Sequence, residues 1–213
     1  MTASRPTLPT DYFTAVYDGS PDPWGFTDRW YEERKRDVTL AALPQRRYAT
    51  GYEPGCSIGV LTQGLAVRCD ALLATDVSES ALDAARARLA GSSHVRFHQQ
   101  ALPQGWPDGA FDLVVLSELL YYLGDDDLGE VARLAVDAVA PGGTLVSVHW
   151  RHPVRDYPQT GDAAQQAVSD AAAAHLVPTV RHVEADFDLA VHVRPRPGEK
   201  TSHVSVAACD GLC

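Results

Sequence analysis

The sequence predicts an α/β fold with a doubly wound, mostly parallel sheet of seven strands. Three observations lead to this prediction. Apolar runs of strand length alternate with helical patterns along the chain from residue 48 onwards. Each gap between consecutive strands holds a helix or leaves room for one, as a parallel crossover requires. The run AFDLVVLS (110–117) has an unbroken apolar core, which suits a strand covered by helices on both faces.

The sequence of residues 1–45 predicts helices and no strand. Residues 11–17 (DYFTAVY) predict a short helix, and SPDPWGF (20–26) predicts a turn-rich link with two aromatic side chains. A longer helix is expected over residues 30–43, because apolar side chains recur there at helical spacing and a proline follows. We expect residues 1–45 to form a helical cap or lid on a core of residues 46–213, within a single domain.

The elements of the core follow in order. Five strands are predicted at 48–53, 69–76, 94–99, 110–117 and 143–150, and four helices at 58–66, 78–90, 125–140 and 162–175. Ser78 is a suitable N-cap for the second of these helices. Three Asp residues complement the dipole of the third at its start, and PGG (141–143) is expected to end it. Two further strands are expected in the tail (179–208), around RPRPGEK (194–200).

Composition bounds the class of protein. The 213 residues are 45% hydrophobic and 22% charged, which suits one packed domain. The net charge is −10 and the basic residues form no run, so no nucleic-acid partner is expected. No apolar stretch is long enough to span a membrane and the N-terminus has no secretory pattern, so we expect a cytoplasmic protein. The four cysteines form no C-x-x-C pair, and no metal site is expected.

Candidate site residues lie where the predicted strands end. In an open parallel sheet, a ligand binds beyond the carboxyl ends of the strands, at the point where the strand order reverses. The first strand runs into EPGCSIG, which contains Glu53, Gly55, Cys56, Ser57 and Gly59. The two glycines allow the backbone to turn sharply and to approach a ligand without a Cβ clash.

The spacing of this turn argues against two common nucleotide-binding motifs. A dinucleotide-binding turn requires G-x-G-x-x-G, but Ser57 occupies the second glycine position and the third glycine is missing. The lysine of a phosphate-binding P-loop is missing as well. A tight strand-to-helix turn without a ligand stays the alternative for this motif taken alone.

The next two strand ends supply further candidates for a nucleoside site. Asp76, followed by Val77, ends the second strand, and a carboxylate there can accept hydrogen bonds from both hydroxyls of a ribose. The alternative is that Asp76 only caps the following helix. After the third strand, Gln100, Ala101 and Leu102 are expected beside an adenine ring, which a backbone N–H and the glutamine side chain could hold.

Five runs of the sequence together resemble a known family. They are PDPWGF…WYEERK, EPGCSIGVLT, DVSESALDAA, FDLVVLSELLYYL and APGGTLVSVHW, and they cover roughly residues 11–150. This combination resembles the NodS-type group of class I S-adenosylmethionine-dependent methyltransferases. The resemblance implies a Rossmann-like methyltransferase sheet, with S-adenosyl-L-methionine as cofactor and S-adenosyl-L-homocysteine as product. NodS enzymes N-methylate the free amine of a deacetylated glucosamine on a chitooligosaccharide. The loop HWRHPVRDYPQTGD (149–162), where acceptor contacts are expected, departs from the NodS pattern.

With this cofactor, the end of the fourth strand should face the methionine part and the acceptor. Ser117 is expected at the cofactor. Glu118 is the first candidate for a base that takes the proton of an acceptor amine, and His149, at the end of the fifth strand, is the second. For His149 the alternative is a packing role. Methyltransferases can also work by proximity alone, in which case no base is required.

Aromatic side chains are expected around the acceptor. The candidates are Tyr121, Tyr122, Trp150 and Tyr157. For the two adjacent tyrosines, the alternative is that they pack a short helix.

Two side chains of the cap are expected at the cofactor. Trp24 could close over it as part of a lid. Arg34 lies between Tyr31 and Val38 at helical spacing, which predicts an inward-facing guanidinium that binds the terminal carboxylate of the cofactor. The alternative is that Arg34 pairs with an acidic side chain of the protein.

The sequence therefore predicts an S-adenosylmethionine-dependent methyltransferase with a small-molecule acceptor, acting by N-methylation of an amino sugar or related amine. An O-methyltransferase of a natural-product or sugar hydroxyl is one alternative, and a non-catalytic nucleoside-binding protein is another. A nicotinamide oxidoreductase is disfavoured because G-x-G-x-x-G is missing. Monomer and homodimer both stay open.

Overall fold

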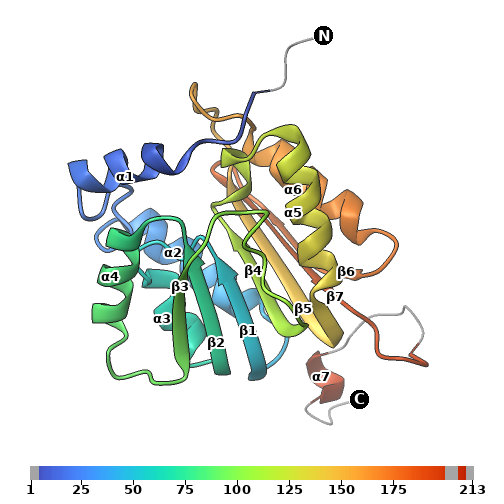
Figure 1. The fold of residues 1–213 in the computed structure, drawn as a ribbon. Coiled ribbons are helices and arrows are strands. Elements are labelled where there is room, and N and C mark those ends of the chain that lie inside the picture. The colour runs from blue at the N-terminus through green and yellow to red at the C-terminus, as the bar shows by residue number, and fades with distance from the viewer. Residues whose placement is uncertain (1–4, 200–205, 210–213) are drawn as a thin grey trace.

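A computed structural model describes residues 5–199 and 206–209, in which seven strands form one sheet (Figure 1). The strand order across the sheet is β3-β2-β1-β4-β5-β7-β6. The strands are β1 (Tyr48–Pro54), β2 (Cys69–Asp76), β3 (Val95–Gln99), β4 (Phe111–Ser117), β5 (Val139–Trp150), β6 (Val177–Val183) and β7 (Phe187–Val193).

The direction of the strands confirms the predicted doubly wound, mostly parallel sheet. β7 is antiparallel to both of its neighbours, β5 and β6, and all other pairings are parallel. From β1 the chain proceeds to β2 and β3 on one side, and from β4 it proceeds to β5 on the other. The strand order therefore reverses between β1 and β4, and a ligand site is expected beyond the carboxyl ends of these two strands.

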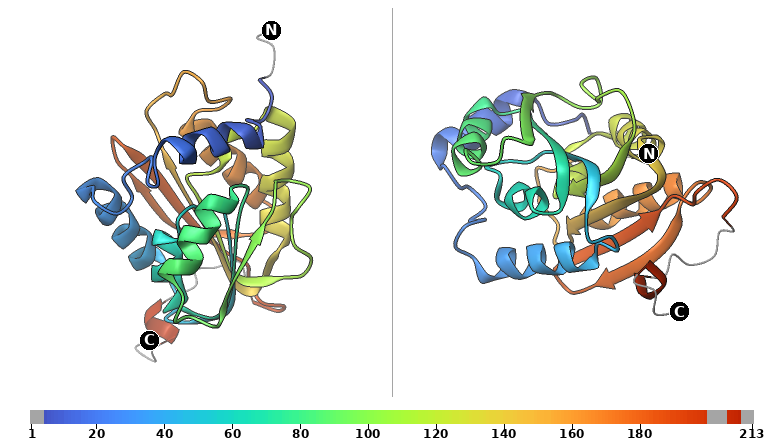
Figure 2. Two further views of the ribbon diagram at one scale, coloured as in Figure 1. Left: turned by 60° about the vertical axis from the view of Figure 1, so that its left-hand side comes forward. Right: turned by 90° about the horizontal axis from the view of Figure 1, so that it is seen from below.

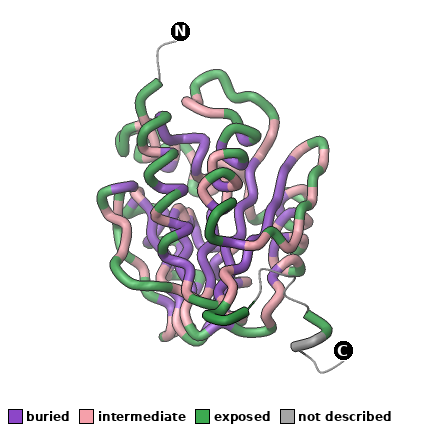
Figure 3. Tube along the Cα trace, turned by 90° about the vertical axis from the view of Figure 1, so that its right-hand side faces the viewer, coloured by how far each residue is buried: buried purple, intermediate pink, exposed green. Residues whose placement is uncertain are grey.

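Helices cover both faces of the sheet. They are α1 (Thr10–Gly19), α2 (Trp30–Ala42), α3 (Val60–Ala66), α4 (Glu79–Arg88), α5 (Asp125–Asp137), α6 (Gly161–Ala172) and α7 (Val206–Cys209), with a 3-10 turn at Leu120–Tyr122. Successive side chains of β4 point to opposite faces. Leu113 and Val115 pack in a cluster with Leu65 of α3, whereas Val114 and Leu116 pack with helix α5. Figure 3 shows buried strands between helices with exposed outer surfaces.

The boundary between α5 and β5 differs from the prediction. Helix α5 ends at Asp137, and β5 begins at Val139, so that the APGG run lies within the strand and does not follow the helix. Val139 pairs with Phe111, and the register of the pair then shifts before Leu113 meets Thr144. The extra residues form a bulge, in which Gly142 adopts a φ of 82° that favours glycine.

The predicted strands of the tail are placed differently in the structure. β6 and β7 form a hairpin that ends before RPRPGEK (194–200), so this run does not lie between them. Every residue of β7 is buried, and the strand pairs with β5 and β6 on its two sides. The second tail strand was expected beyond RPRPGEK, up to residue 208. Residues 201–205 lie outside the described part of the chain. The residues that follow form the helical turn α7 and not a strand.

Residues ahead of β1 lie across the carboxyl ends of the strands. In Figures 1 and 2, α1 passes over this edge of the sheet, and the segment before it runs beside the loop between β5 and α6. This places N-terminal side chains over the point where the strand order reverses. No helix in the described ranges has the length and apolar character needed to cross a lipid bilayer.

Candidate active site

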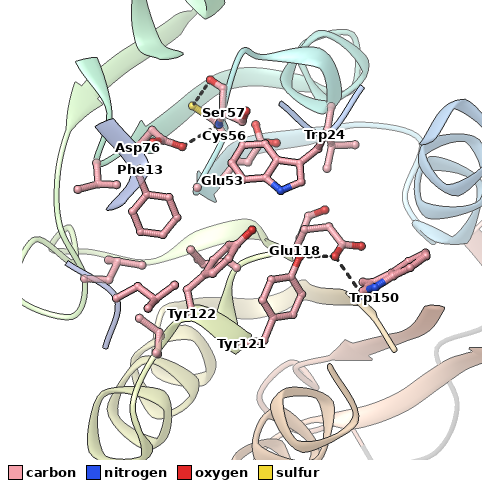
Figure 4. Close-up of a pocket in the computed structure, with 18 of the residues that line it drawn as sticks. Phe13, Trp24, Glu53, Cys56, Ser57, Asp76, Glu118, Tyr121, Tyr122 and Trp150 are labelled. Carbon is pink, nitrogen blue, oxygen red and sulfur yellow. Dashed lines mark hydrogen bonds between the residues drawn. The ribbon is translucent and has the colours of Figure 1, made fainter. Parts of the chain in front are cut away.

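A cavity of about 500 Å³ lies at the carboxyl ends of the strands, where the strand order reverses (Figure 4). It brings together most of the residues that the sequence analysis singled out. The cavity is lined by eleven of the residues predicted to contact the cofactor, namely Trp24, Glu53, Gly55, Cys56, Ser57, Asp76, Val77, Gln100, Ala101, Leu102 and Ser117. It is also lined by Glu118, the first candidate for a base, and by the four aromatic residues predicted around the acceptor, Tyr121, Tyr122, Trp150 and Tyr157. Gly59, Arg34 and His149 do not line it.

The turn after β1 presents a buried carboxyl group to the cavity. Glu53 is 2% exposed, and its Oε2 has no hydrogen-bond partner. Burial raises the pKa of Glu53 to about 8, because water no longer stabilises the charged form. The turn itself uses left-handed backbone at Gly55 (φ 70°) and at Ser57 (φ 51°), the latter an uncommon conformation for a residue with a Cβ.

Asp76, at the end of β2, holds this turn in place. Its Oδ2 accepts a hydrogen bond from the Ser57 N–H (2.8 Å) and its Oδ1 accepts one from the Ser78 N–H (2.9 Å). Ser78 in turn caps α4 by accepting a hydrogen bond from the Ala81 N–H (3.3 Å). The ionised carboxylate has four lone-pair positions, so two are left for a ligand. Burial raises the pKa of Asp76, although these backbone hydrogen bonds act against the rise.

The prediction that Gly59 contacts the cofactor is wrong. Gly59 is the residue before α3, with a φ of 78°. A Cβ at this position would lie 2.9 Å from the Cβ of Ala85 and 3.1 Å from Leu89. Glycine is therefore needed here for close packing of the start of α3 against α4, and the cavity is lined by Val60 beyond it.

The turn after β3 contributes an amide side chain. The Gln100 N–H donates to the carbonyl oxygen of Asp76 (2.9 Å), which keeps this turn next to the end of β2. The side-chain Oε1 of Gln100 is buried and has no hydrogen-bond partner. Like Oε2 of Glu53, it is a buried acceptor atom, without a donor, in a residue that lines the cavity.

An aromatic group from the N-terminal segment covers this end of the cavity. Tyr17 of α1 packs edge to face with Trp24, with ring centroids 5.5 Å apart, and Trp24 packs against Phe26. The hydroxyl of Tyr17 lies 2.5 Å from Oγ of Ser57. The sequence analysis named Trp24 but missed Tyr17. An aromatic residue in a short predicted helix was the available signal, but it does not indicate a partner in a distant turn.

Glu118, immediately after β4, is the centre of a second polar group. Its Oε1 lies 2.7 Å from Nζ of Lys35, and its Oε2 accepts hydrogen bonds from the hydroxyl of Tyr121 (2.6 Å) and the Trp150 N–H (3.0 Å). Its backbone has a left-handed φ of 54°. Burial by itself raises the pKa of Glu118, but the Lys35 ammonium and the donated hydrogen bonds outweigh burial and lower it. Glu118 is therefore a carboxylate at neutral pH.

Lys35 joins Glu118 to a second carboxylate. Its Nζ lies 3.0 Å from Oε2 of Glu32 and 4.8 Å from the centre of the Tyr31 ring. Glu32 and Lys35 are both buried and both line the cavity. With both carboxyl groups ionised, this group has a formal charge of −1; burial raises the pKa of Glu32, and the Lys35 ammonium acts against the rise. The sequence did not predict Glu32 and Lys35 at the site, since charged residues on a helix usually face solvent.

The prediction that Arg34 binds the cofactor is wrong, because its guanidinium faces away from the cavity. It forms two hydrogen bonds with the carboxylate of Glu184, of 2.6 and 2.7 Å, and its side chain is 42% exposed. The inward face of α2 contains Tyr31, Lys35 and Val38, at spacings of four and three residues. The helical period fits Arg34 or Lys35 equally well, and the buried partner Glu118 stabilises the arrangement with Lys35 inside.

The prediction that His149 takes a proton from an acceptor is also wrong. The side chain is fully buried behind the cavity wall, and its Nδ1 lies 3.0 Å from Oε1 of Gln165. The other amide atom of Gln165 donates to Ser147 (2.7 Å), which leaves Oε1 to accept the Nδ1 proton. Burial lowers the pKa of His149, so the ring is neutral and has a packing role.

Aromatic rings form the wall on the Glu118 side of the cavity. The rings of Tyr121 and Tyr157 are stacked, 5.2 Å apart and 9° from parallel. Tyr122 packs edge to face against Tyr121 at 4.7 Å, and Trp150 packs against Tyr31 at 5.1 Å. In Figure 4, Tyr121, Tyr122, Trp150 and Glu118 lie on one side of the cavity, and Glu53, Ser57 and Asp76 lie on the other. In the residues that the structure describes, no three His, Cys, Asp or Glu side chains are placed to hold a metal ion.

The sheet order, the reversed β7 and the cavity beside β1 and β4 define the class: this is a class I, Rossmann-like methyltransferase fold. Residues 17–162 match the family described as Nodulation protein S (NodS). The chain belongs to the NodS family.

Individual relatives agree with this assignment. Nodulation protein S of Rhizobium tropici is 35% identical over 130 residues, which are 59% of this chain and 53% of that protein, so the match spans about half the length of the relative. A crystal structure of a Pseudomonas syringae protein, assigned as a methyltransferase, is 42% identical with a TM-score of 0.69, over 78% of this chain and 100% of that chain. N-methyltransferase NodS from Bradyrhizobium japonicum WM9, in complex with S-adenosyl-L-homocysteine, shares the fold at 24% identity with a TM-score of 0.76, over 88% of this chain and 99% of that chain.

Proposed function

We propose that this protein is an S-adenosylmethionine-dependent methyltransferase that N-methylates a small amine, either an amino sugar or a related compound. The observation that supports this most is the division of one cavity into two ends. One end has unpartnered acceptor atoms suited to an adenosine with an amino-acid tail. The other has an anionic group and aromatic rings suited to a cationic or hydroxylated acceptor.

The residues at the first end fit S-adenosyl-L-methionine. The Oε2 of Glu53 is buried without a donor, and the ammonium of the amino-acid tail would supply one. Asp76 has free lone pairs for the ribose hydroxyls, and Oε1 of Gln100 can accept from the adenine amino group. Trp24, with Tyr17 beside it, covers this end and excludes water. The donor, when bound, supplies an activated methyl group on a sulfonium.

The residues at the second end position the acceptor. The charge of −1 on Glu32, Lys35 and Glu118 attracts an amine in its ammonium form and disfavours anionic acceptors. The amine must lose a proton to expose its lone pair, after which nitrogen forms the new bond to carbon as the bond from carbon to sulfur breaks. Alignment of the two reactants can supply ~7–11 kcal/mol of the barrier.

Glu118 is better suited to hold the acceptor than to take its proton. Its two oxygens already accept from Lys35, Tyr121 and Trp150, and its pKa is lowered. We therefore propose that the amine loses its proton to solvent and that the enzyme acts by proximity and electrostatics. This argues against an O-methyltransferase, because a hydroxyl requires a base more than an amine does and neither Glu118 nor His149 is available.

The test has two stages. Calorimetric titration with S-adenosyl-L-methionine and with S-adenosyl-L-homocysteine should show binding of both. Incubation with methyl-labelled donor and a panel of amino sugars, simple amines and their hydroxyl analogues should then label only amines. Binding without labelling of any acceptor would support a non-catalytic nucleoside-binding protein instead. The cytoplasmic location, the small-molecule partner without nucleic acid, and a monomeric or homodimeric state stay predictions.

A further inference from the structure

The segment that precedes α1 is tied to two other parts of the chain. The guanidinium of Arg5 donates to the carbonyl oxygens of Arg155 (2.7 Å) and Tyr157 (3.0 Å), in the loop between β5 and α6. The Leu8 N–H donates to the carbonyl oxygen of Tyr122 (2.9 Å). We call residues 5–9 the strap.

The strap is also fixed at the start of α5. The hydroxyl of Thr7 accepts a hydrogen bond from the Gly124 N–H (2.9 Å) and donates one to the carboxylate of Asp127. Backbone of Arg5, Pro6 and Thr7 lies so close to Gly124 that a Cβ there would be 2.7 Å from the Arg5 carbonyl oxygen. The strap therefore contacts the protein on both sides of the acceptor end of the cavity.

The loop between β5 and α6, which the strap contacts, also covers the acceptor end. Tyr157 stacks on Tyr121, and the Gln159 N–H donates to the carbonyl oxygen of Tyr121 (3.2 Å). As a result, Tyr121 and Tyr122 line the cavity and yet are only 6% and 7% exposed.

The volume of the cavity limits what fits beside the donor. The donor and the acceptor share about 500 Å³. A pocket for a single drug-sized ligand already has a volume of about 300–1,000 Å³. The further rings of a longer acceptor therefore have to extend out of the cavity, past the strap or the loop.

We propose that the acceptor is a small amine with no more than one ring, and that the strap and the loop between β5 and α6 exclude oligomeric amines. This inference rests on the proposed N-methyltransferase function. The parts of Tyr121 and Tyr122 that line the cavity would border the ring, and Glu118 would attract its ammonium. Arg5 is then a specificity-determining residue, through its contact with the loop.

Binding separates this inference from the proposed function. The protein saturated with S-adenosyl-L-homocysteine is titrated by calorimetry with ethanolamine, glucosamine, and the dimer and tetramer of deacetylated glucosamine. We expect glucosamine to bind at least about tenfold more tightly than the tetramer. A flat or rising affinity from monomer to tetramer, or no binding of any of the four amines, would overturn the inference. Binding of glucosamine without methyl transfer from S-adenosyl-L-methionine would contradict only the proposed function.

An Arg5→Ala variant tests the strap directly. Loss of the two hydrogen bonds to the loop should increase affinity for the tetramer at least about fivefold and leave that for glucosamine within about twofold. Arg96→Ala, which removes an exposed guanidinium on the edge strand β3, is the matched control and should change neither. If Arg5→Ala and Arg96→Ala have the same tetramer affinity, the strap does not determine acceptor size. Circular dichroism of both variants checks that they are folded.

Discussion

The ammonium of Lys35 lies 2.7 Å from a carboxylate oxygen of Glu118 and 3.0 Å from one of Glu32, so one side chain of α2 joins two acidic groups across the cavity wall. This ion group connects the N-terminal helices to the end of β4. It also sets the charge that an acceptor meets.

Replacement of Lys35 should destabilise the protein strongly. In Lys35→Met the two buried carboxylates lose their common partner, and breaking such a pair costs about 3–5 kcal/mol of the free energy of unfolding. Arg34→Met is the matched control, because it removes an ion pair on the surface, and it should leave stability and donor affinity nearly unchanged. Urea denaturation measures the stability of both variants, and calorimetric titration measures their donor affinity. Equal destabilisation by the two substitutions would contradict the burial of Lys35.

Glu53 should make stability depend on pH. Its pKa in the folded protein is about 8, above its ordinary value of 4.5, so folding favours the protonated form. The native state is then destabilised as pH rises from about 4.5 to about 8, with no further change above that range. Glu53→Gln removes this effect and should be more stable than the unsubstituted protein by about 2–5 kcal/mol at pH 9, at about 1.4 kcal/mol per pKa unit, and similar to it at pH 4.

The exposed Glu130 provides a control for this experiment. Glu130→Gln should show the same stability as the unsubstituted protein at pH 4 and pH 9. Binding of the donor should also release a proton from Glu53 below pH 8, because the ammonium of the amino-acid tail favours the charged carboxylate. Calorimetry in buffers with different ionisation enthalpies measures that proton. No proton release at pH 7 would argue against a contact between Glu53 and the tail.

Asp76 should determine donor affinity. Asp76→Asn leaves one oxygen to accept from the backbone but removes the charge and one acceptor site, so affinity for S-adenosyl-L-homocysteine should fall by about tenfold or more. Asp70→Asn, at the exposed start of the same strand, should bind as before. Calorimetry compares the two variants. If Asp76→Asn binds S-adenosyl-L-homocysteine with unchanged affinity, the role of Asp76 is only to hold the backbone of Ser57 and Ser78.

The pH profile of methyl transfer should follow the acceptor and not Glu118. Because the pKa of Glu118 is lowered below that of an ordinary glutamate, its titration lies outside the range of pH 6 to 10. The value of kcat/KM should rise with pH as the amine loses its proton, with a midpoint that shifts between two amines of different pKa. Glu118→Gln should keep this profile and raise KM. A midpoint that is the same for both amines and disappears in Glu118→Gln would identify Glu118 as the base.

Local patterns in the sequence were enough to predict the first five strands, the helices between them and the strand ends that form the cavity. Alternation of apolar runs and the need for a crossover between parallel strands restrict the topology to few arrangements. The carboxyl ends of those strands must then meet at one edge, which placed Glu53, Asp76, Gln100 and Glu118 around one site. The same reasoning could not locate the β6–β7 hairpin, because β7 buries two polar side chains, Asp188 and His192, which interrupt the apolar run expected of a covered strand.

The side chains that complete the site were decided by contacts between distant parts of the chain. Arg34 and Lys35 fit the inward face of α2 equally well by their spacing, and only the position of Glu118 selects Lys35. Gly59 is required by α4, and Nδ1 of His149 is paired with Gln165. The sequence by itself thus determined the fold and the place of the cavity, because both follow from local periodicity. The tertiary structure alone decided which charged and aromatic groups face it, because burial of such groups depends on partners that no local pattern specifies.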